Sequence, residues 1–137
     1  AALHKLFFHV YDAQFWTDDS SGWNMKTPHA LYLTYDVSID KDDLVERTLD
    51  ELQRNKEVTT QMLDEYRKEL PSLFTNIRSG QSITALYKPD EGIIFCHDGK
   101  KTGVLRNVAL AEPFMGIWLG KTSSEPEMRN ALLGKNK

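Results

Sequence analysis

Residues that bind metals or form crosslinks are scarce in this sequence. Cys96 is the only cysteine among 137 residues, which excludes an internal disulfide and argues against a cysteine-based zinc site. The four histidines are scattered, and neither HExxH nor CxxC occurs. A glycine-rich phosphate loop and the G-x-S-x-G motif are missing as well. We therefore expect no metal, no cofactor and no nucleophile of these familiar kinds.

The sequence also lacks long apolar runs and any excess of charge of one sign. No stretch approaches the roughly 18 consecutive apolar residues of a membrane helix, so no integral membrane segment is expected. The 17 basic and 20 acidic residues are mixed along the chain and give a formal net charge of -3. No basic stripe alternates with aromatic residues, so nucleic acid is not an expected partner.

The composition is that of one ordinary globular domain. The hydrophobic fraction of 40% over 137 residues suffices for a single core, so residues 1–137 are expected to form one domain. The sequence starts at Ala1 rather than at methionine. Removal of a signal peptide would explain this start and predicts a periplasmic or exported protein, although a shortened chain would explain it equally. The oligomeric state stays open.

One stretch, residues 6–16 (LFFHVYDAQFW), dominates the chain and is predicted to be a strand. Alternation puts two polar groups, of His9 and Tyr11, on a mainly apolar face. In the simplest interpretation these are hydrogen-bonded core residues of a central strand. In the other, the face lines a pocket. The side chains of this face are Phe7, His9, Tyr11, Ala13 and Phe15.

The remaining pattern predicts further strands and helices. Helix 41–54 has one apolar face, and a second helix begins at Thr59 or Thr60 and is interrupted by Pro71. Asp98-Gly99 indicates a hairpin, and Asn107 caps a third helix. The resulting class is α+β, with a mostly antiparallel sheet covered on one face by helices. The predicted strands after the first are 30–39, 83–87, 93–97 and 102–105, and the last helices are 108–119 and 124–133.

Helix 41–54 carries two polar residues of interest. Arg47 has the geometry to clamp a carboxylate in a bidentate manner. It has an equally ordinary alternative, which is to extend to the surface beside Glu51, four residues later. Thr48 follows it on the apolar side of the helix.

Three segments together resemble the bacterial chalcone isomerase-like family. They are residues 10–16 (VYDAQFW), 42–48 (DDLVERT) and 114–134 (FMGIWLGKTSSEPEMRNALLG), which nearly span the chain in the family's order. The resemblance implies the chalcone isomerase fold, an open-faced β-sandwich in which a large antiparallel sheet is covered by helices. It also implies a ligand cleft between the sheet and the helices.

The resemblance further implies that the plant catalytic set is not retained. The threonine of the first core strand falls on Tyr11, and the late-helix threonine falls on Ile117, with Trp118 beside it. The tyrosine and asparagine of the covering region fall near Lys41 and Thr48, and the cleft arginine would precede Ala1. Enzymatic activity is therefore uncertain, and a non-catalytic function is favoured.

Three functional hypotheses follow. The first is a non-catalytic protein that binds a small apolar molecule, such as a fatty acid, in the cleft. Its polar anchor would be Tyr11, assisted by Arg47 or Thr48. Its apolar walls would be Phe7, Phe15, Ile117 and Trp118. The second is an isomerase or intramolecular lyase that uses Tyr11 and His9, since histidine titrates near neutral pH. The third is a structural or protein-interaction role with a filled cleft.

Overall fold

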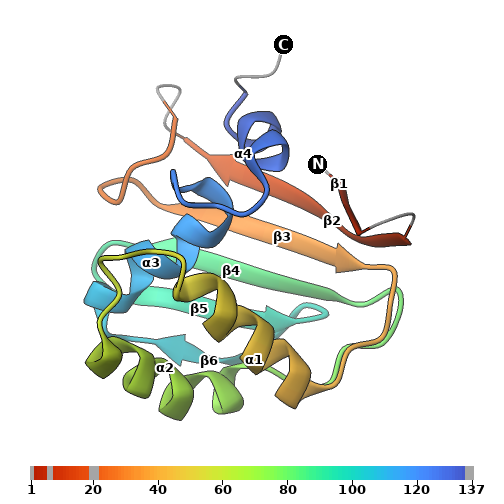
Figure 1. Ribbon diagram of the computed structural model, residues 1–137, viewed down its shortest axis with the longest axis horizontal. Coiled ribbons are helices and arrows are strands. Elements are labelled where there is room, and N and C mark those ends of the chain that lie inside the picture. The colour runs from red at the N-terminus through yellow and green to blue at the C-terminus, as the bar shows by residue number, and fades with distance from the viewer. Residues whose placement is uncertain (1, 6–7, 19–21, 135–137) are drawn as a thin grey trace.

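The computed structural model describes residues 2–5, 8–18 and 22–134, with side chains from Val10 onward (Figure 1). Six strands form one sheet in the order β1-β2-β3-β4-β5-β6, and each strand is antiparallel to its neighbour. This arrangement is an up-and-down meander, interrupted by two helices between β3 and β4. The strands are β1 Ala2–Lys5, β2 Phe8–Thr17, β3 His29–Tyr35, β4 Ser82–Lys88, β5 Gly92–His97 and β6 Lys100–Leu105.

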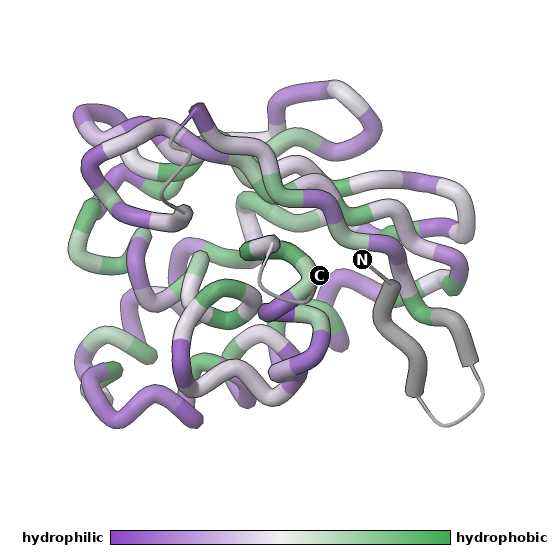
Figure 2. Tube along the Cα trace, turned by 90° about the horizontal axis from the view of Figure 1, so that it is seen from above, coloured by the Kyte–Doolittle hydropathy of each residue, from purple (hydrophilic) through white to green (hydrophobic). Residues whose placement is uncertain are grey.

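Four helices cover one face of this sheet, as Figures 1 and 2 show from two directions. They are α1 Lys41–Leu52, α2 Thr60–Leu73, α3 Val108–Leu119 and α4 Pro126–Leu132. The core lies between the two layers, where the inward residues of the strands meet the apolar faces of the helices. The predicted α+β class, an antiparallel sheet with helices on one face, is confirmed.

Alternation along the strands decides which side chains reach the core. On β3, Leu31, Leu33 and Tyr35 are buried, while Tyr32 between them is 36% exposed. On β2, Ala13 is fully buried and its neighbours point outward. This agrees with the face expected for Tyr11, Ala13 and Phe15, because the period of two is a property of the extended chain.

Three boundaries differ from the expectations. The strand expected over 6–16 is present as β2, Phe8–Thr17, but β1, Ala2–Lys5, precedes it and was not expected. Strand β3 ends at Tyr35, and Ile39 instead pairs with Ile77. Helix α2 continues through Pro71 to Leu73, so the proline neither stops nor restarts it. Pro71 is exposed, so water can satisfy the carbonyl that its missing N–H leaves unpaired.

Two local predictions are confirmed. Asp98 and Gly99 both have positive φ, 52° and 87°, as the tight β5–β6 hairpin requires. The Asn107 side chain accepts a hydrogen bond from the backbone N–H of Ala109 at 3.0 Å and caps α3.

A buried histidine fixes the loop between β2 and β3 onto the sheet. His29, only 3% exposed, donates from Nδ1 to the Thr27 carbonyl and accepts at Nε2 from the indole N–H of Trp23, at 3.1 Å. These two bonds are compatible only with the neutral ring. Burial lowers the pKa of His29, and the bond to Thr27 opposes that shift.

Candidate functional site

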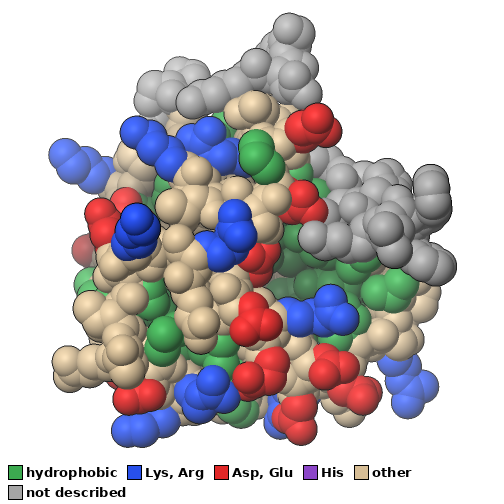
Figure 3. Space-filling view, in the orientation of Figure 1, with side chains coloured by type: hydrophobic (Ala, Val, Ile, Leu, Met, Phe, Trp, Pro, Cys, Tyr) green, Lys and Arg blue, Asp and Glu red, His purple; other side chains and the backbone are tan. Residues whose placement is uncertain are grey.

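A cleft of about 250 Å³ opens between β2, β3, α1 and α3. Figure 3 shows a hollow with a hydrophobic floor on the helix-covered face, bordered by acidic and basic side chains. The cleft exists because α1 and α3 cover the sheet incompletely near the C-terminal end of β3. Its lining residues are Val10, Tyr11, Tyr35, Ile39, Leu44, Arg47, Thr48, Asp50, Glu51, Ile117 and Trp118.

Tyr11 lines the cleft from β2 and is hydrogen-bonded to a side chain of α3. The indole N–H of Trp118 donates to its hydroxyl oxygen at 2.9 Å. Burial raises the pKa of Tyr11 to about 12, the Trp118 bond lowers it, and the charges of Glu125 and Glu51 raise it further. The phenol is therefore neutral near pH 7. It is a hydrogen-bond donor to a neighbour rather than a general base.

Tyr35 forms a second phenol beside the first. It is paired with Tyr11 in the β2–β3 register, and the two ring centroids are 5.3 Å apart. Burial and the neighbouring Tyr11 raise the pKa of Tyr35, while the charge of Arg47 lowers it. Within the described part of the chain the Tyr35 hydroxyl has no hydrogen-bond partner, so it can donate to a molecule in the cleft.

Charged side chains occupy the rim of the cleft. Arg47 is exposed, and two acids, Asp50 and Glu51, line the same opening. Glu51 accepts a hydrogen bond from the Ser124 hydroxyl and has the Nε of Arg54 at 3.8 Å. The expected neighbour of Arg47 is thus engaged elsewhere, and Arg47 forms no ion pair with the described side chains. The rim favours a weakly charged or neutral head group over a strongly anionic one.

Behind the cleft lies a small apolar cavity of about 30 Å³. Four residues line both spaces: Tyr35, Leu44, Thr48 and Trp118. The Thr48 hydroxyl already donates to the Leu44 carbonyl at 2.8 Å, so toward a ligand it can only accept a hydrogen bond. The inner cavity is large enough for one or two waters and too small for a ligand.

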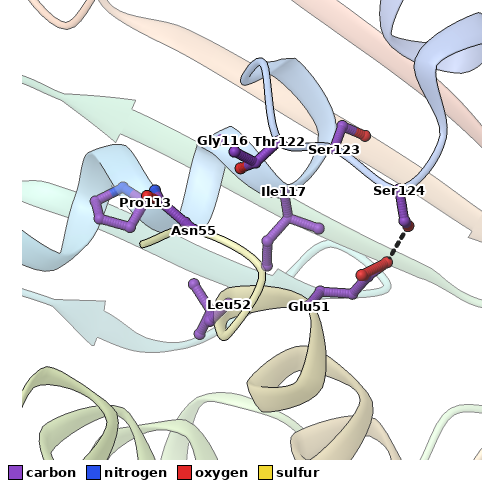
Figure 4. Close-up of a pocket in the computed structure, with 9 residues that line it drawn as sticks. All are labelled: Glu51, Leu52, Asn55, Pro113, Gly116, Ile117, Thr122, Ser123 and Ser124. Atoms are coloured by element: carbon purple, nitrogen blue, oxygen red, sulfur yellow. Dashed lines mark hydrogen bonds between the residues drawn. The ribbon is translucent and has the colours of Figure 1, made fainter. Parts of the chain in front are cut away.

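A polar crevice continues the cleft past Glu51 and Ile117 (Figure 4). Its volume is about 10 Å³, room for one water at most. Figure 4 shows the side chains of Ser124 and Glu51 pointing at each other across it, from the loop before α4 and from α1. This contact ties the loop before α4 to α1 beside the cleft.

The structure brings together five of the eight residues singled out in the sequence, namely Tyr11, Arg47, Thr48, Ile117 and Trp118. Phe15 is not among them. Its ring lies 5.7 Å from His29, and it lines a separate groove between β2 and α4. A strand residue four positions from Tyr11 is too far along β2 to reach the same opening. Phe7 and the side chain of His9 lie outside the described residues.

Sequence reasoning missed six of the residues that line the cleft: Val10, Tyr35, Ile39, Leu44, Asp50 and Glu51. Strand pairing was the signal that could have found Tyr35, because antiparallel pairing of the first two strands with Tyr35 facing inward puts it beside Tyr11. Nothing local marked Asp50 and Glu51, which read as ordinary exposed helix positions.

Metal and membrane features are not found in the part of the chain that the structure describes. No three His, Cys, Asp or Glu side chains within 2–5, 8–18 and 22–134 gather as metal ligands would. No described helix is long and apolar enough to cross a membrane.

Comparisons with known proteins agree with the geometry. A crystal structure of a fatty-acid binding protein from Arabidopsis thaliana is similar, with a TM-score of 0.74 and 13% sequence identity; the match covers 91% of this chain and 77% of the other. At 13% identity, this similarity shows a shared fold and nothing about function. No curated protein matches the chain. The model of the chalcone isomerase-like family matches residues 4–134, nearly the whole sequence. The chain belongs to the chalcone isomerase-like family.

Proposed function

We propose that this protein binds a small amphiphilic molecule in the cleft between sheet and helices, and that it does so without catalysing a reaction. The observation that carries the proposal is the cleft of about 250 Å³ with apolar walls and two neutral phenols in its interior. Concave, mostly apolar sites with a few convergent polar groups are the usual form of small-molecule sites. The similarity to a fatty-acid binding protein supports ligand binding in general.

The head of the ligand would lie beside Tyr11, Tyr35 and Arg47. Both phenols are held neutral by burial, so they serve as donors. Arg47 would add a charge-assisted bond to a carboxylate. Asp50 and Glu51 at the same rim oppose a full negative charge. A fatty acid is therefore one candidate, and an uncharged molecule with a hydroxyl or carbonyl head is favoured by the rim.

The body of the ligand would lie against Ile117, Leu44 and Trp118. A volume of about 250 Å³ is just below the roughly 300–1,000 Å³ typical of drug-sized sites. A compact ligand fits this space as it stands. A longer tail requires the indole of Trp118 to move and join the cleft to the cavity behind it.

The test compares three ten-carbon probes, decanol, decanoic acid and decylamine, by calorimetry and thermal melting. A bound ligand at 100 times its Kd stabilises the fold by about 2.7 kcal/mol. We expect decanol to bind more tightly than decanoic acid, because Asp50 and Glu51 oppose a carboxylate, and more tightly than decylamine, because an ammonium group has no lone pair to accept from the two phenols. Loss of a head-group bond in Tyr35→Phe should weaken decanol binding about five- to tenfold. The matched control is Tyr32→Phe, on the uncovered face of the sheet, which should bind normally. No binding of any probe at millimolar concentration would contradict the proposal.

Two other functions are less favoured. An isomerase or lyase that uses Tyr11 as its base conflicts with a pKa of about 12, and its second group, His9, has no described side chain. A filled-cleft structural role has one observation in its favour, the Trp118–Tyr11 hydrogen bond across the opening. That role predicts no ligand at all, so the same experiment separates it from ligand binding. A bacterial origin and an exported location stay predictions.

A further inference from the structure

Arg47 and Glu51 lie one turn apart on α1 and both line the cleft, but they form no ion pair. On a helix, side chains four residues apart are neighbours, with their Cβ atoms about 5–6 Å apart, and opposite charges at that spacing attract. Arg47 is exposed, and none of the described carboxylates forms an ion pair with it. The pairing that helical spacing favours is therefore prevented by contacts that Glu51 makes elsewhere.

Both carboxylate oxygens of Glu51 are held by other groups. The Ser124 hydroxyl, from the loop before α4, donates to Oε1, and Figure 4 shows the two side chains pointing at each other. The Nε of Arg54 lies 3.8 Å from Oε2 and also donates to the Thr122 carbonyl at 3.3 Å. Neither oxygen of Glu51 is therefore bonded to Arg47.

Arg47 is left to act on the interior of the cleft. Burial and the neighbouring Tyr11 raise the pKa of Tyr35, whereas the charge of Arg47 lowers it, so the guanidinium group lies within electrostatic reach of this phenol. A guanidinium group offers only hydrogen-bond donors. Its partner in the cleft is therefore an acceptor oxygen of the ligand, and an anionic oxygen is bound most strongly.

We infer that Ser124 is a positioning residue of the cleft: by holding Glu51, it leaves Arg47 available to the head group of the ligand. Ser124 lines the small crevice beside the cleft and not the cleft itself. It acts on the ligand only through Glu51 and Arg47, and it sets how well the cleft accepts a carboxylate relative to a hydroxyl. The inference rests on the ligand site proposed above.

Two other acids lie at helical spacing from Arg47. Asp43 is four residues before it and Asp50 three residues after it, and both are exposed. Asp43 is in the first turn of α1, where the positive end of the helix dipole stabilises its charge. Both aspartates are unchanged in every variant below, so any effect that they have on Arg47 cancels in the comparison.

The test is calorimetric titration of decanol and decanoate at pH 7.5 and about 20 mM salt, where charges are weakly screened. The quantity compared is the ratio of the two Kd values, because a general loss of stability would change both alike. Ser124→Ala frees Glu51 to pair with Arg47 and should weaken decanoate binding about two- to threefold, while decanol binding stays the same. Ser124→Thr keeps the hydroxyl and should keep the ratio.

The matched control is Ser123→Ala in the same loop. The Ser123 hydroxyl accepts from the backbone N–H of Glu125 at 3.2 Å and is not bonded to Glu51, so the ratio should not change. Arg47→Gln provides a second control: in that background Ser124→Ala should leave the ratio unchanged, because the group that Glu51 would capture is gone. Glu51→Gln should strengthen decanoate binding about three- to tenfold, because it removes a negative charge at the rim.

An unchanged ratio in Ser124→Ala would overturn the inference. An equal change in the Arg47→Gln background would overturn it as well, because Ser124 would then act by another route. In both cases decanol would still bind, so the proposed function would stand. Binding of neither probe to the unaltered protein would instead refute the proposed function, and this inference with it.

Discussion

Trp118 is predicted to limit the length of ligand that the cleft accepts. Its indole donates to Tyr11 at 2.9 Å, and its ring centroid lies 5.4 Å from that of Phe114. It also lines both the cleft and the inner cavity of about 30 Å³. Trp118→Ala removes this wall and should join the two spaces into one.

Trp118→Ala should lower the stability of the fold and raise the affinity for long ligands, and both quantities can be measured. Replacing a fully buried Trp or Phe by Ala costs about 3–5 kcal/mol, and Trp118 is only partly buried, so we expect about 2 kcal/mol of lost stability. Each additional CH₂ that a ligand buries contributes about 0.8 kcal/mol, close to fourfold in affinity. Two or three further methylenes in the joined space would therefore strengthen binding by roughly 15- to 60-fold.

The assay is calorimetric titration with a series of primary alcohols from six to fourteen carbons. The affinity of the unaltered protein should level off at a shorter chain than that of Trp118→Ala. The matched control is Trp16→Ala, since Trp16 is exposed and lies outside the cleft; its chain-length profile should equal that of the unaltered protein. Identical profiles for Trp118→Ala and the unaltered protein would refute the reasoning about this wall.

Two further predictions concern stability. Burial lowers the pKa of His29 in the folded state. As the pH falls below about 6.5, the unfolded state therefore binds more protons than the folded state. The contribution of the neutral ring to stability is complete above that pH and is lost as the pH falls toward the folded-state pKa. Urea unfolding from pH 7.5 to 5 should show this slope, and His29→Gln should flatten it; equal slopes would contradict the assignment. Gly92 has φ +95°, and an added Cβ would lie 2.0 Å from the Leu105 carbonyl oxygen, whereas Gly80 at φ +93° meets nothing within 4 Å. Thermal melting should therefore show a loss above about 3 kcal/mol for Gly92→Ala and about 1–2 kcal/mol for Gly80→Ala; equal losses would show that the contact does not matter.

Local chemistry explains which elements were predictable. Asp98-Gly99 formed the expected hairpin because both residues tolerate positive φ. Asn107 capped its helix because its side chain reaches a free backbone N–H. Strand β1 was missed, since the sequence between Ala2 and Val10 has no Gly, Pro or Asn to separate it from β2.

In the candidate site, too, local patterns predicted the direction of a side chain but not its neighbours. Alternation in β2 determined that Tyr11 faces the helices, and helical periodicity determined that Thr48 lies on the buried side of α1. Neither pattern determined the neighbours of these residues. The Trp118–Tyr11 bond joins positions 107 residues apart, and the Ser124–Glu51 bond joins positions 73 apart.

The sequence by itself determined the class of the fold, the inward faces of its strands and helices, and the family. These properties follow from short-range periodicity and from motifs in a fixed order, which are present in the chain before it folds. Only the tertiary structure decided that Tyr35, Arg47 and Glu51 meet at one opening and that Phe15 lies elsewhere. Such neighbours depend on strand register and on how helices seat against the sheet, and those are set by the packing of the whole core.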